Sequence, residues 1–530
     1  MLKLFKALQN TNLYSKIIYL ITISIMFCYV FYQLRYSVVA NDDMQDFICL
    51  DLNFYHGRFF TTLFQYLFIK KIPELLNINY QEFAIISQTT IKSFFIIFCT
   101  IVITSSINFF PKTKNYIQLN ITNILVFLLL FALIYNLKFI FGIEVSEFFY
   151  GYIFPIPFFI IFLNKTFKYF VLNKKIKTTS FILYALLTIF LITTNEGYNI
   201  ASITILGLIL LKKIWKIKKE QTKISQLIIL IFISIITMFV MYQSSGFDYV
   251  TKDYDIGLIR EININNINNF LIAFSDRIIK NINFLWITLI LAITINILRK
   301  NNRFFRKKIL IQTAIIHISF LAFFCCLFFL GETFTYENYH FYNVLPKFWI
   351  LQPGLLISYY AIIIYNILFC ISYFNKKTRN KNCIFTTITI ILLCSLFIKQ
   401  NFEISEIAMY ERKKILYIAD KLSVFYFSRG ETATLPTENI NLILPTYQNS
   451  MPKDLEDKTG EAYKNKIYEN ILYFKYLEKN YKVDTKYGCK FKDIDTAIKE
   501  YKDQGGELDD KELQELNFKN IKKEIVQKKH

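Results

Sequence analysis

Apolar stretches of membrane length recur along the first three quarters of the chain, with short polar segments between them. A helix needs roughly 20 apolar residues to cross about 30 Å of hydrocarbon. Eleven stretches meet or approach this length and predict eleven transmembrane helices: Ile17–Leu34, Ala84–Ile107, Leu119–Phe141, Phe148–Leu163, Phe181–Thr194, Gly197–Leu211, Leu227–Tyr242, Phe284–Leu298, Ile309–Leu330, Ile350–Phe374 and Ile384–Ile398. The pattern predicts an all-α polytopic membrane domain over residues 1–398.

Two of these stretches are short and meet at Asn195-Glu196. We interpret them as two separate short spans that converge on these polar residues. The alternative is one long kinked helix, which would reverse the orientation of every later loop. At the N-terminus, Val38-Val39-Ala40 resembles a signal-peptide cleavage site, but the apolar run before it favours a retained anchor.

Basic residues gather in alternate loops. The predicted inner segments hold 26 lysines and arginines and one acid, Glu220, when the N-terminus is placed inside. Positively charged short loops remain on the cytoplasmic side of a membrane. The sequence therefore predicts a cytoplasmic N-terminus and an extracytoplasmic C-terminal domain over residues 399–530.

Composition agrees with this reading. Of 530 residues, 54% are hydrophobic and 19% are charged, with a net charge of +21. The basic excess lies in short inner loops, so membrane topology accounts for it and nucleic-acid binding is not indicated. The nine cysteines form no C-x-x-C motif, which leaves neither a zinc site nor a disulfide framework indicated.

The hydrophilic tail has its own pattern. Helical periodicity is present at Glu403–Leu422 and Tyr463–Tyr481, and Asn439–Leu444 is typical of a strand. Pro436, Pro445 and Pro452 indicate loops. About 130 residues are enough to bury a core of their own.

Three acids follow the first span directly: Asp42, Asp43 and Asp46. If a helix begins at Asn41 or Asp42, their carboxylates share the face of its first turn. Acids also cap helices and complement the helix dipole. Three acids within five residues exceed what capping needs, and their mutual repulsion would raise at least one pKa.

An amphipathic helix is predicted downstream, after His56-Gly57-Arg58. Phe59, Phe60, Leu63, Phe64, Leu67 and Phe68 form its apolar side, with Thr61, Thr62 and Gln65 opposite. We expect it to lie in the outer interface and to end at Lys70-Lys71 and Pro73. Arg58 then lies at interface depth, where it either grips a phosphate with two donors or extends to the membrane surface. A second such helix is predicted at Asn266–Ile282.

Acids at membrane depth are costly and are functional candidates by default. Glu144 and Glu147 precede the fourth span, and Glu196 follows Asn195 at the convergence of two spans. Lys92 and Lys138 are candidate partners of Glu196, or ends that extend to the surface. In the loop before the tenth span, Tyr339 and His340 stand among aromatic and polar residues that suit contact with sugars or an aromatic belt.

This combination resembles the GT-C superfamily of membrane glycosyltransferases, in particular a bacterial branch with glucosyltransferase-like members. The residues that carry the resemblance are Asn41-Asp42-Asp43, Gly57-Arg58, Tyr150-Gly151-Tyr152-Ile153-Phe154-Pro155 and Asn195-Glu196. It extends over residues 1–398 in layout. The sequence departs from the family pattern at His56 and lacks an arginine before the tenth span.

The resemblance implies transfer of a monosaccharide from a polyprenyl-phosphate donor to an extracytoplasmic glycan, lipid or protein acceptor, with inversion. Asp42 or Asp43 would be the general base and Arg58 the phosphate contact. Asp46, His56, Glu144, Glu147, Asn195, Glu196, Tyr339 and His340 would bind substrate. Whether a divalent cation joins the acids is left open, and no other cofactor is expected.

Two other function classes remain open. The first is a transporter or flippase of lipid-linked glycans, in which the acids would line a translocation site. Transporters commonly carry broken helices in both halves, whereas this chain has one break, at Asn195-Glu196. The second is a non-enzymatic envelope assembly protein whose tail binds a partner.

Overall fold

The computed structural model describes ten parts of the chain. They are residues 13–34, 58–77, 84–106, 116–136, 149–171, 174–214, 221–243, single positions between 361 and 395, 417–436, and 477–508 with gaps at 479–480 and 488. The four last predicted spans, the helix at Asn266–Ile282 and the strand at Asn439–Leu444 lie outside these residues or are described only at single positions.

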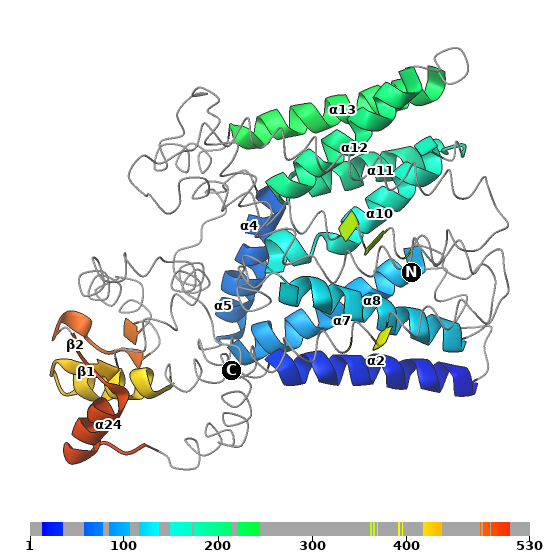
Figure 1. Ribbon diagram of the computed structural model, residues 1–530. Helices are drawn as coiled ribbons and strands as arrows, with labels where there is room; N and C mark the ends of the chain where they lie inside the picture. Colours follow the sequence, from blue (N-terminus) through cyan, green and yellow to red (C-terminus); the bar gives the residue numbers. More distant parts are fainter. Residues whose placement is uncertain are drawn as a thin grey trace, which may run out of the picture.

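The described membrane part is a bundle of helices that run side by side (Figure 1). Its long helices are α2 (Leu13–Leu34), α7 (Lys92–Ser106), α8 (Tyr116–Asn136), α10 (Ile156–Thr166), α11 (Thr178–Ile192), α12 (Glu196–Ile214) and α13 (Gln221–Tyr242). Two π-helical segments precede α7 and α10, namely η2 (Ala84–Ile91) and η3 (Phe149–Ile153), and a third, η4 (Phe167–Val171), follows α10. Each helix lies on one predicted span.

The chain reverses between α11 and α12. Helix α11 ends at Ile192, α12 begins at Glu196, and the two helices pack against each other and against α13 (Figure 1). The prediction of two separate helices that meet at Asn195-Glu196 is therefore confirmed, and the single kinked helix is excluded.

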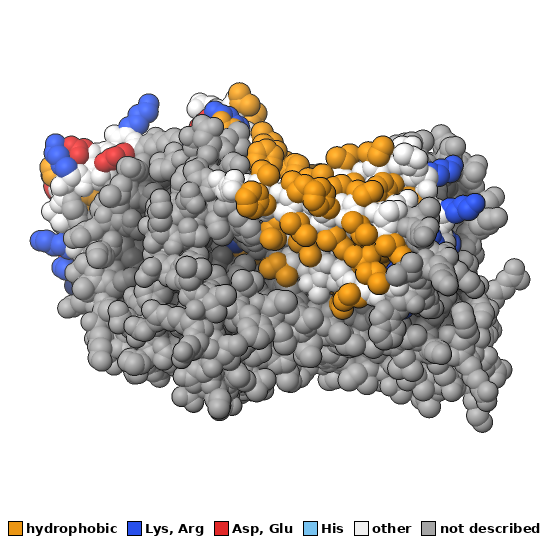
Figure 2. Space-filling model, turned by 90° about the horizontal axis from the view of Figure 1, so that it is seen from above, with side chains coloured by type: hydrophobic (Ala, Val, Ile, Leu, Met, Phe, Trp, Pro, Cys, Tyr) orange, Lys and Arg blue, Asp and Glu red, His pale blue; other side chains and the backbone are white. Residues whose placement is uncertain are grey.

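Within the described residues, four helical stretches are long and apolar enough to cross a membrane: Thr89–Ser106, Phe149–Val171, Gly197–Ile214 and Lys223–Met241. Shorter apolar helices lie at Ile17–Tyr32, Leu119–Phe131 and Thr178–Ile192. One face of α13 exposes Ile228, Phe232, Ile235, Ile236 and Phe239. Figure 2 shows the apolar surface on this side of the bundle, with basic side chains beyond one end of it. Such a surface suits lipid rather than water.

A crosswise arm lies at one end of the bundle (Figure 1). It consists of α4 (Phe59–Gln65), the π-helical segment η1 (Tyr66–Lys71) and α5 (Ile72–Leu76). The expected end at Lys70-Lys71 and Pro73 is wrong: α5 follows η1 without a break, and the helix passes Pro73 and continues to Leu76. It ends at Asn77, which adopts a left-handed conformation (φ +51°).

The polar side of this arm faces the protein. Thr61, Thr62 and Gln65 are buried, whereas Phe59 and Leu67 are exposed. Buried polar groups need hydrogen-bond partners, and the Thr61 hydroxyl finds one inside the bundle, in the Thr194 carbonyl. The arm therefore brings a polar stripe to the end of the bundle.

Aromatic side chains connect the arm to the bundle. Phe68 stacks on Tyr150 at 5.5 Å, Phe64 meets Phe154 edge to face at 4.7 Å, and Phe60 lies 5.0 Å from Phe190. Such ring pairs add to the free energy of area burial, by roughly 0.5–1.5 kcal/mol each. They hold α4 and η1 against η3, the turn that follows it, and α11.

A small α/β unit follows the membrane part and lies beyond the arm end of the bundle (Figure 1). Strand β1 (Ala433–Pro436) pairs in parallel with β2 (Cys489–Lys492), and α24 (Ile494–Asp503) packs on both strands. A helix over residues 417–428 precedes β1 and turns at Gly430, where φ is +71°. The expected helix end at Leu422 is therefore six residues short, and Pro436 ends a strand rather than marking a loop.

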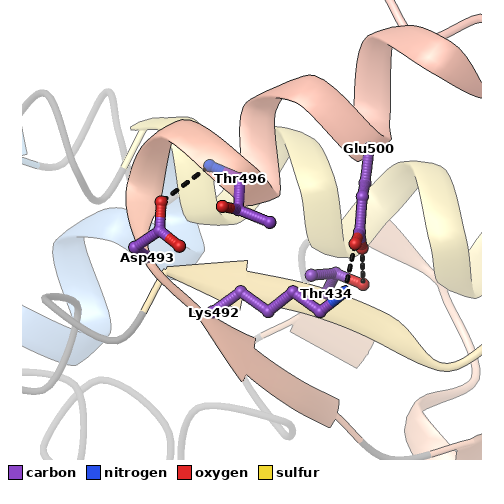
Figure 3. Close-up of polar contacts among 5 residues, drawn as sticks. All are labelled: Thr434, Lys492, Asp493, Thr496 and Glu500. Atoms are coloured by element: carbon purple, nitrogen blue, oxygen red, sulfur yellow. Dashed lines mark hydrogen bonds and ion pairs between the residues drawn. The ribbon is translucent and has the colours of Figure 1, made fainter.

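Polar contacts join the three elements of this unit (Figure 3). On α24, Glu500 accepts a hydrogen bond from Thr434 of β1 at 3.3 Å and pairs with Lys492 of β2. Asp493 caps α24 by accepting from the Thr496 backbone N–H at 2.8 Å. Phe425 and Tyr501 meet at 4.7 Å in the core.

Candidate functional site

The first turn of α4 is fixed on the connection between α11 and α12. The Phe60 N–H donates to the Thr193 carbonyl at 3.2 Å, and the Thr61 hydroxyl donates to the Thr194 carbonyl at 2.6 Å. These carbonyls stand at the end of α11, where no further turn of the helix supplies donors. Residues 58–61 and 193–196, which are separated by more than 130 positions, thus form one locus.

Asn195 is the N-cap of α12. Its side-chain oxygen accepts from the Gly197 N–H at 2.8 Å, which satisfies one of the free donors of the first turn. The backbone of Glu196 occupies the first helical position, where the dipole is positive and favours negative charge. This end of α12 faces the start of α4.

Arg58 is buried at the same locus. Its side chain is only 8% exposed, and its guanidinium lies 5.6 Å from the centre of the Tyr152 ring. Of the two interpretations of Arg58, extension to the surface does not fit this burial. A buried guanidinium is suited to bind a phosphate or a carboxylate with paired donors.

Tyr152 belongs to η3, which is held from two sides. The Tyr198 hydroxyl of α12 donates to the Tyr152 carbonyl at 2.6 Å. On the other side, Gly151 approaches Thr61 so closely that a Cβ there would lie 3.2 Å from the Thr61 methyl. The Tyr150-Gly151-Tyr152 segment therefore lies between the arm and α12.

Lys92 is a second buried cation at this end. It is completely buried at the start of α7, and its ammonium lies 5.6 Å from the centre of the Phe149 ring in η3. A buried lysine in a membrane bundle is a functional candidate. The proposed pairing with Glu196 is untested, because the side chain of Glu196 lies outside the described residues.

Three buried polar atoms at the start of α12 have no hydrogen-bond partner. The Asn195 side-chain nitrogen, the Asn199 side-chain oxygen and the Ser202 hydroxyl are buried without a hydrogen-bond partner. Asn199 and Ser202 follow Asn195 by four and seven residues, which puts the three side chains on one face of the helix. Asn199 and Ser202 are not among the residues predicted from the sequence; their spacing from Asn195 was the available signal.

Of the predicted site residues, the structure brings Arg58 and Asn195 to one locus, together with the backbone of Glu196. The others lie outside the described residues: Asp42, Asp43, Asp46, His56, Glu144, Glu147, Tyr339 and His340. Their roles stay predictions. Within the described ranges, no three His, Cys, Asp or Glu side chains are grouped to hold a metal ion.

By length and apolar composition, the described helices fit a multi-span helical membrane protein. No protein-family model, no curated protein and no solved structure matches the chain. Function must therefore be argued from the residues of the site.

Proposed function

We propose that the chain is a membrane glycosyltransferase that moves a monosaccharide from a polyprenyl-phosphate donor to a glycan, lipid or protein acceptor outside the cell membrane. One observation carries the proposal. A buried arginine, Arg58, lies at the arm end of the bundle beside the N-terminus of α12. The locus thus pairs a cation for a phosphate with a polar helix end for sugar hydroxyls.

The position of the acids in the chain supports the same site. Asp42, Asp43 and Asp46 lie in the connection from α2 to α4. That connection starts at Leu34, whose carbonyl accepts from Thr89 of η2, and ends at Arg58. Its two ends stand at the arm end of the bundle (Figure 1). Both described ends of the segment that carries the acids, Leu34 and Arg58, therefore lie at this end of the bundle.

The chemistry follows from these groups. Asp42 or Asp43 takes the proton of the acceptor hydroxyl, and the resulting oxygen attacks the anomeric carbon of the donor sugar. The bond from that carbon to the phosphate oxygen breaks, and polyprenyl phosphate leaves with the electron pair. Arg58 stabilises the negative charge that grows on the phosphate. A single displacement inverts the anomeric centre.

The remaining predicted residues bind and orient substrate. Asn195 and Glu196 hydrogen-bond sugar hydroxyls, with Asp46, His56, Glu144, Glu147, Tyr339 and His340 around them. A divalent cation at the acids remains an open alternative. The protein would act in the plasma membrane of a bacterium, in envelope polysaccharide assembly, with its N-terminus in the cytoplasm and its tail outside.

The test is sugar transfer in membranes that contain the full chain, with labelled polyprenyl-phosphate sugars as donors. Asp42→Asn and Asp43→Asn must be introduced together in one double variant, since either of the adjacent carboxylates could act as the base when the other is removed. A positioned base contributes roughly 10²–10⁴-fold. We therefore expect turnover to fall about 100-fold or more while donor binding is kept.

Wild-type turnover in the correctly inserted double variant would exclude this mechanism. Movement of intact lipid-linked glycan across the bilayer, without any transfer, would instead favour the transporter reading. Both assays use the same membranes, so a single preparation separates the two function classes.

A further inference from the structure

We propose that Tyr152 and Tyr198 are positioning residues that hold the Arg58 guanidinium in place for an anionic phosphate. The inference rests on the phosphate-binding role of Arg58 in the proposed function. It assigns to two tyrosines a task that their burial alone does not require.

The ring of Tyr152 supplies a surface for the cation. A guanidinium within about 6 Å of a ring centre is attracted by the negative face of the ring, more strongly when water is excluded. The Arg58–Tyr152 distance of 5.6 Å and the burial of both side chains meet these conditions. A long arginine side chain loses rotamer entropy when it binds a ligand, and the ring restricts the side chain in advance.

The segment η3 needs a donor from outside. In a π-helix, the carbonyl of residue i accepts from the N–H of residue i+5. For Tyr152 that position is Pro157, which has no N–H. The Tyr198 hydroxyl donates to this carbonyl at 2.6 Å. Tyr198 is itself fully buried and lies 5.2 Å from Phe159, so α12 fixes the backbone that carries the ring.

The third contact returns to the arm. Gly151 allows η3 to lie directly against Thr61, and the Thr61 hydroxyl is bonded to the Thr194 carbonyl. Arg58, one turn before Thr61, is thereby placed relative to both η3 and the start of α12. The arm contacts η3, η3 contacts α12, and the start of α12 contacts the arm, so the three elements surround the Arg58–Tyr152 pair.

A matched control exists in the same bundle. Tyr184 of α11 is also buried, and its hydroxyl forms one hydrogen bond, to Thr166 of α10. It stacks on Phe162 at 5.5 Å. Tyr184→Phe therefore removes one buried tyrosine hydroxyl, as Tyr198→Phe does, in contacts that do not include Arg58.

The experiment measures binding of a long-chain polyprenyl phosphate to the purified full chain by native mass spectrometry, with the free polyprenol as the phosphate-free control. Loss of one buried hydrogen bond is expected to weaken phosphate-dependent binding about 2- to 10-fold in Tyr198→Phe. Tyr152→Leu should weaken it about 2- to 30-fold, since the cation loses its ring. Tyr152→Phe keeps the ring and should bind like the wild type, and so should Tyr184→Phe.

Arg58→Lys separates this inference from the proposed function. If Arg58→Lys binds like the wild type, the phosphate role of Arg58 is wrong and the inference falls with it. If Arg58→Lys is weakened while Tyr198→Phe and Tyr152→Leu bind normally, only the positioning role is wrong. Equal losses in Tyr198→Phe and Tyr184→Phe would show a general packing effect and would also overturn it.

Discussion

Gly151 stands where η3 meets α4, and its missing side chain sets how closely the two elements approach. A Cβ at this position would lie 3.2 Å from the Thr61 methyl, which is tighter than ordinary contact. Thr61 cannot easily retreat, because it is β-branched, buried and hydrogen-bonded to Thr194. The glycine is needed for space rather than for an unusual backbone conformation.

We therefore predict that Gly151→Ala lowers the unfolding free energy by roughly 1–3 kcal/mol, the usual cost of overpacking. Thr61→Ser removes the opposing methyl and keeps the hydroxyl, so Gly151→Ala in the Thr61→Ser background should cost much less. Gly207→Ala is the control: nothing lies within 4 Å of its Cβ position, and a helical alanine there should stabilise α12 by about 0.4–1 kcal/mol. Thermal unfolding of the four variants in detergent measures these differences; additive losses would contradict the contact.

At the scale of elements, the spans were predictable because lipid imposes a length and an apolar composition on each helix. Helix α13, for example, was expected at Leu227–Tyr242 and extends over Gln221–Tyr242. Which side of the arm contacts the protein could not be predicted from the sequence. Amphipathicity gives two faces but does not say which one meets protein, and here Thr61 and Gln65 turn inward.

Contacts between distant parts of the chain could not be predicted either, in the tail or at the candidate site. The pairing of Ala433 with Cys489 joins positions more than 50 residues apart, which leaves no periodic signal in the sequence. Arg58 and Asn195 were each recognisable as candidates. Their common locus depends on the Thr61–Thr194 hydrogen bond, which the sequence alone does not specify.

Helix α24 carries a prediction about pH. Hydrogen bonds from Thr496 hold the pKa of Asp493 below its ordinary value, and the hydrogen bond from Lys492 does the same for the pKa of Glu500. A carboxyl group with a lowered pKa in the folded state stabilises that state above its unfolded pKa, about 4. This contribution is lost as the pH falls through the lower, folded-state pKa.

We expect hydrogen-exchange protection of α24 in the full chain, corrected for intrinsic exchange, to decrease below about pH 4. Asp493→Asn should keep most of the protection at neutral pH, because asparagine also caps helices, but should lose part of the acid response. Asp493→Ala should lose protection at all pH values. Constant wild-type protection from pH 7 to pH 3 would refute the role of these carboxylates.

At the scale of the whole molecule, charge and shape point to one orientation. Lys174, Lys175 and Lys177 are exposed before α11, and Lys212 is exposed near the end of α12. They stand at the ends of these helices away from Thr193–Glu196 and the arm. Basic loops stay in the cytoplasm, and we therefore propose that the arm, Arg58 and the N-terminus of α12 lie on the outer side.

The last prediction follows from this orientation. Reporters fused after residues 175 and 303 should report the cytoplasm, and a reporter fused after residue 450 should report the outside, since the predicted inner loops hold 26 basic residues and one acid. Two reporters distinguish the sides of the membrane: a fluorescent protein that matures only in the cytoplasm, and a phosphatase that is active only outside it. Loss of the basic cluster at Lys174, Lys175 and Lys177 by substitution with glutamine should weaken the bias of the first fusion. A cytoplasmic residue 450 would contradict eleven spans, and an outer residue 175 would place Arg58 on the cytoplasmic side, where an extracytoplasmic donor could not reach it.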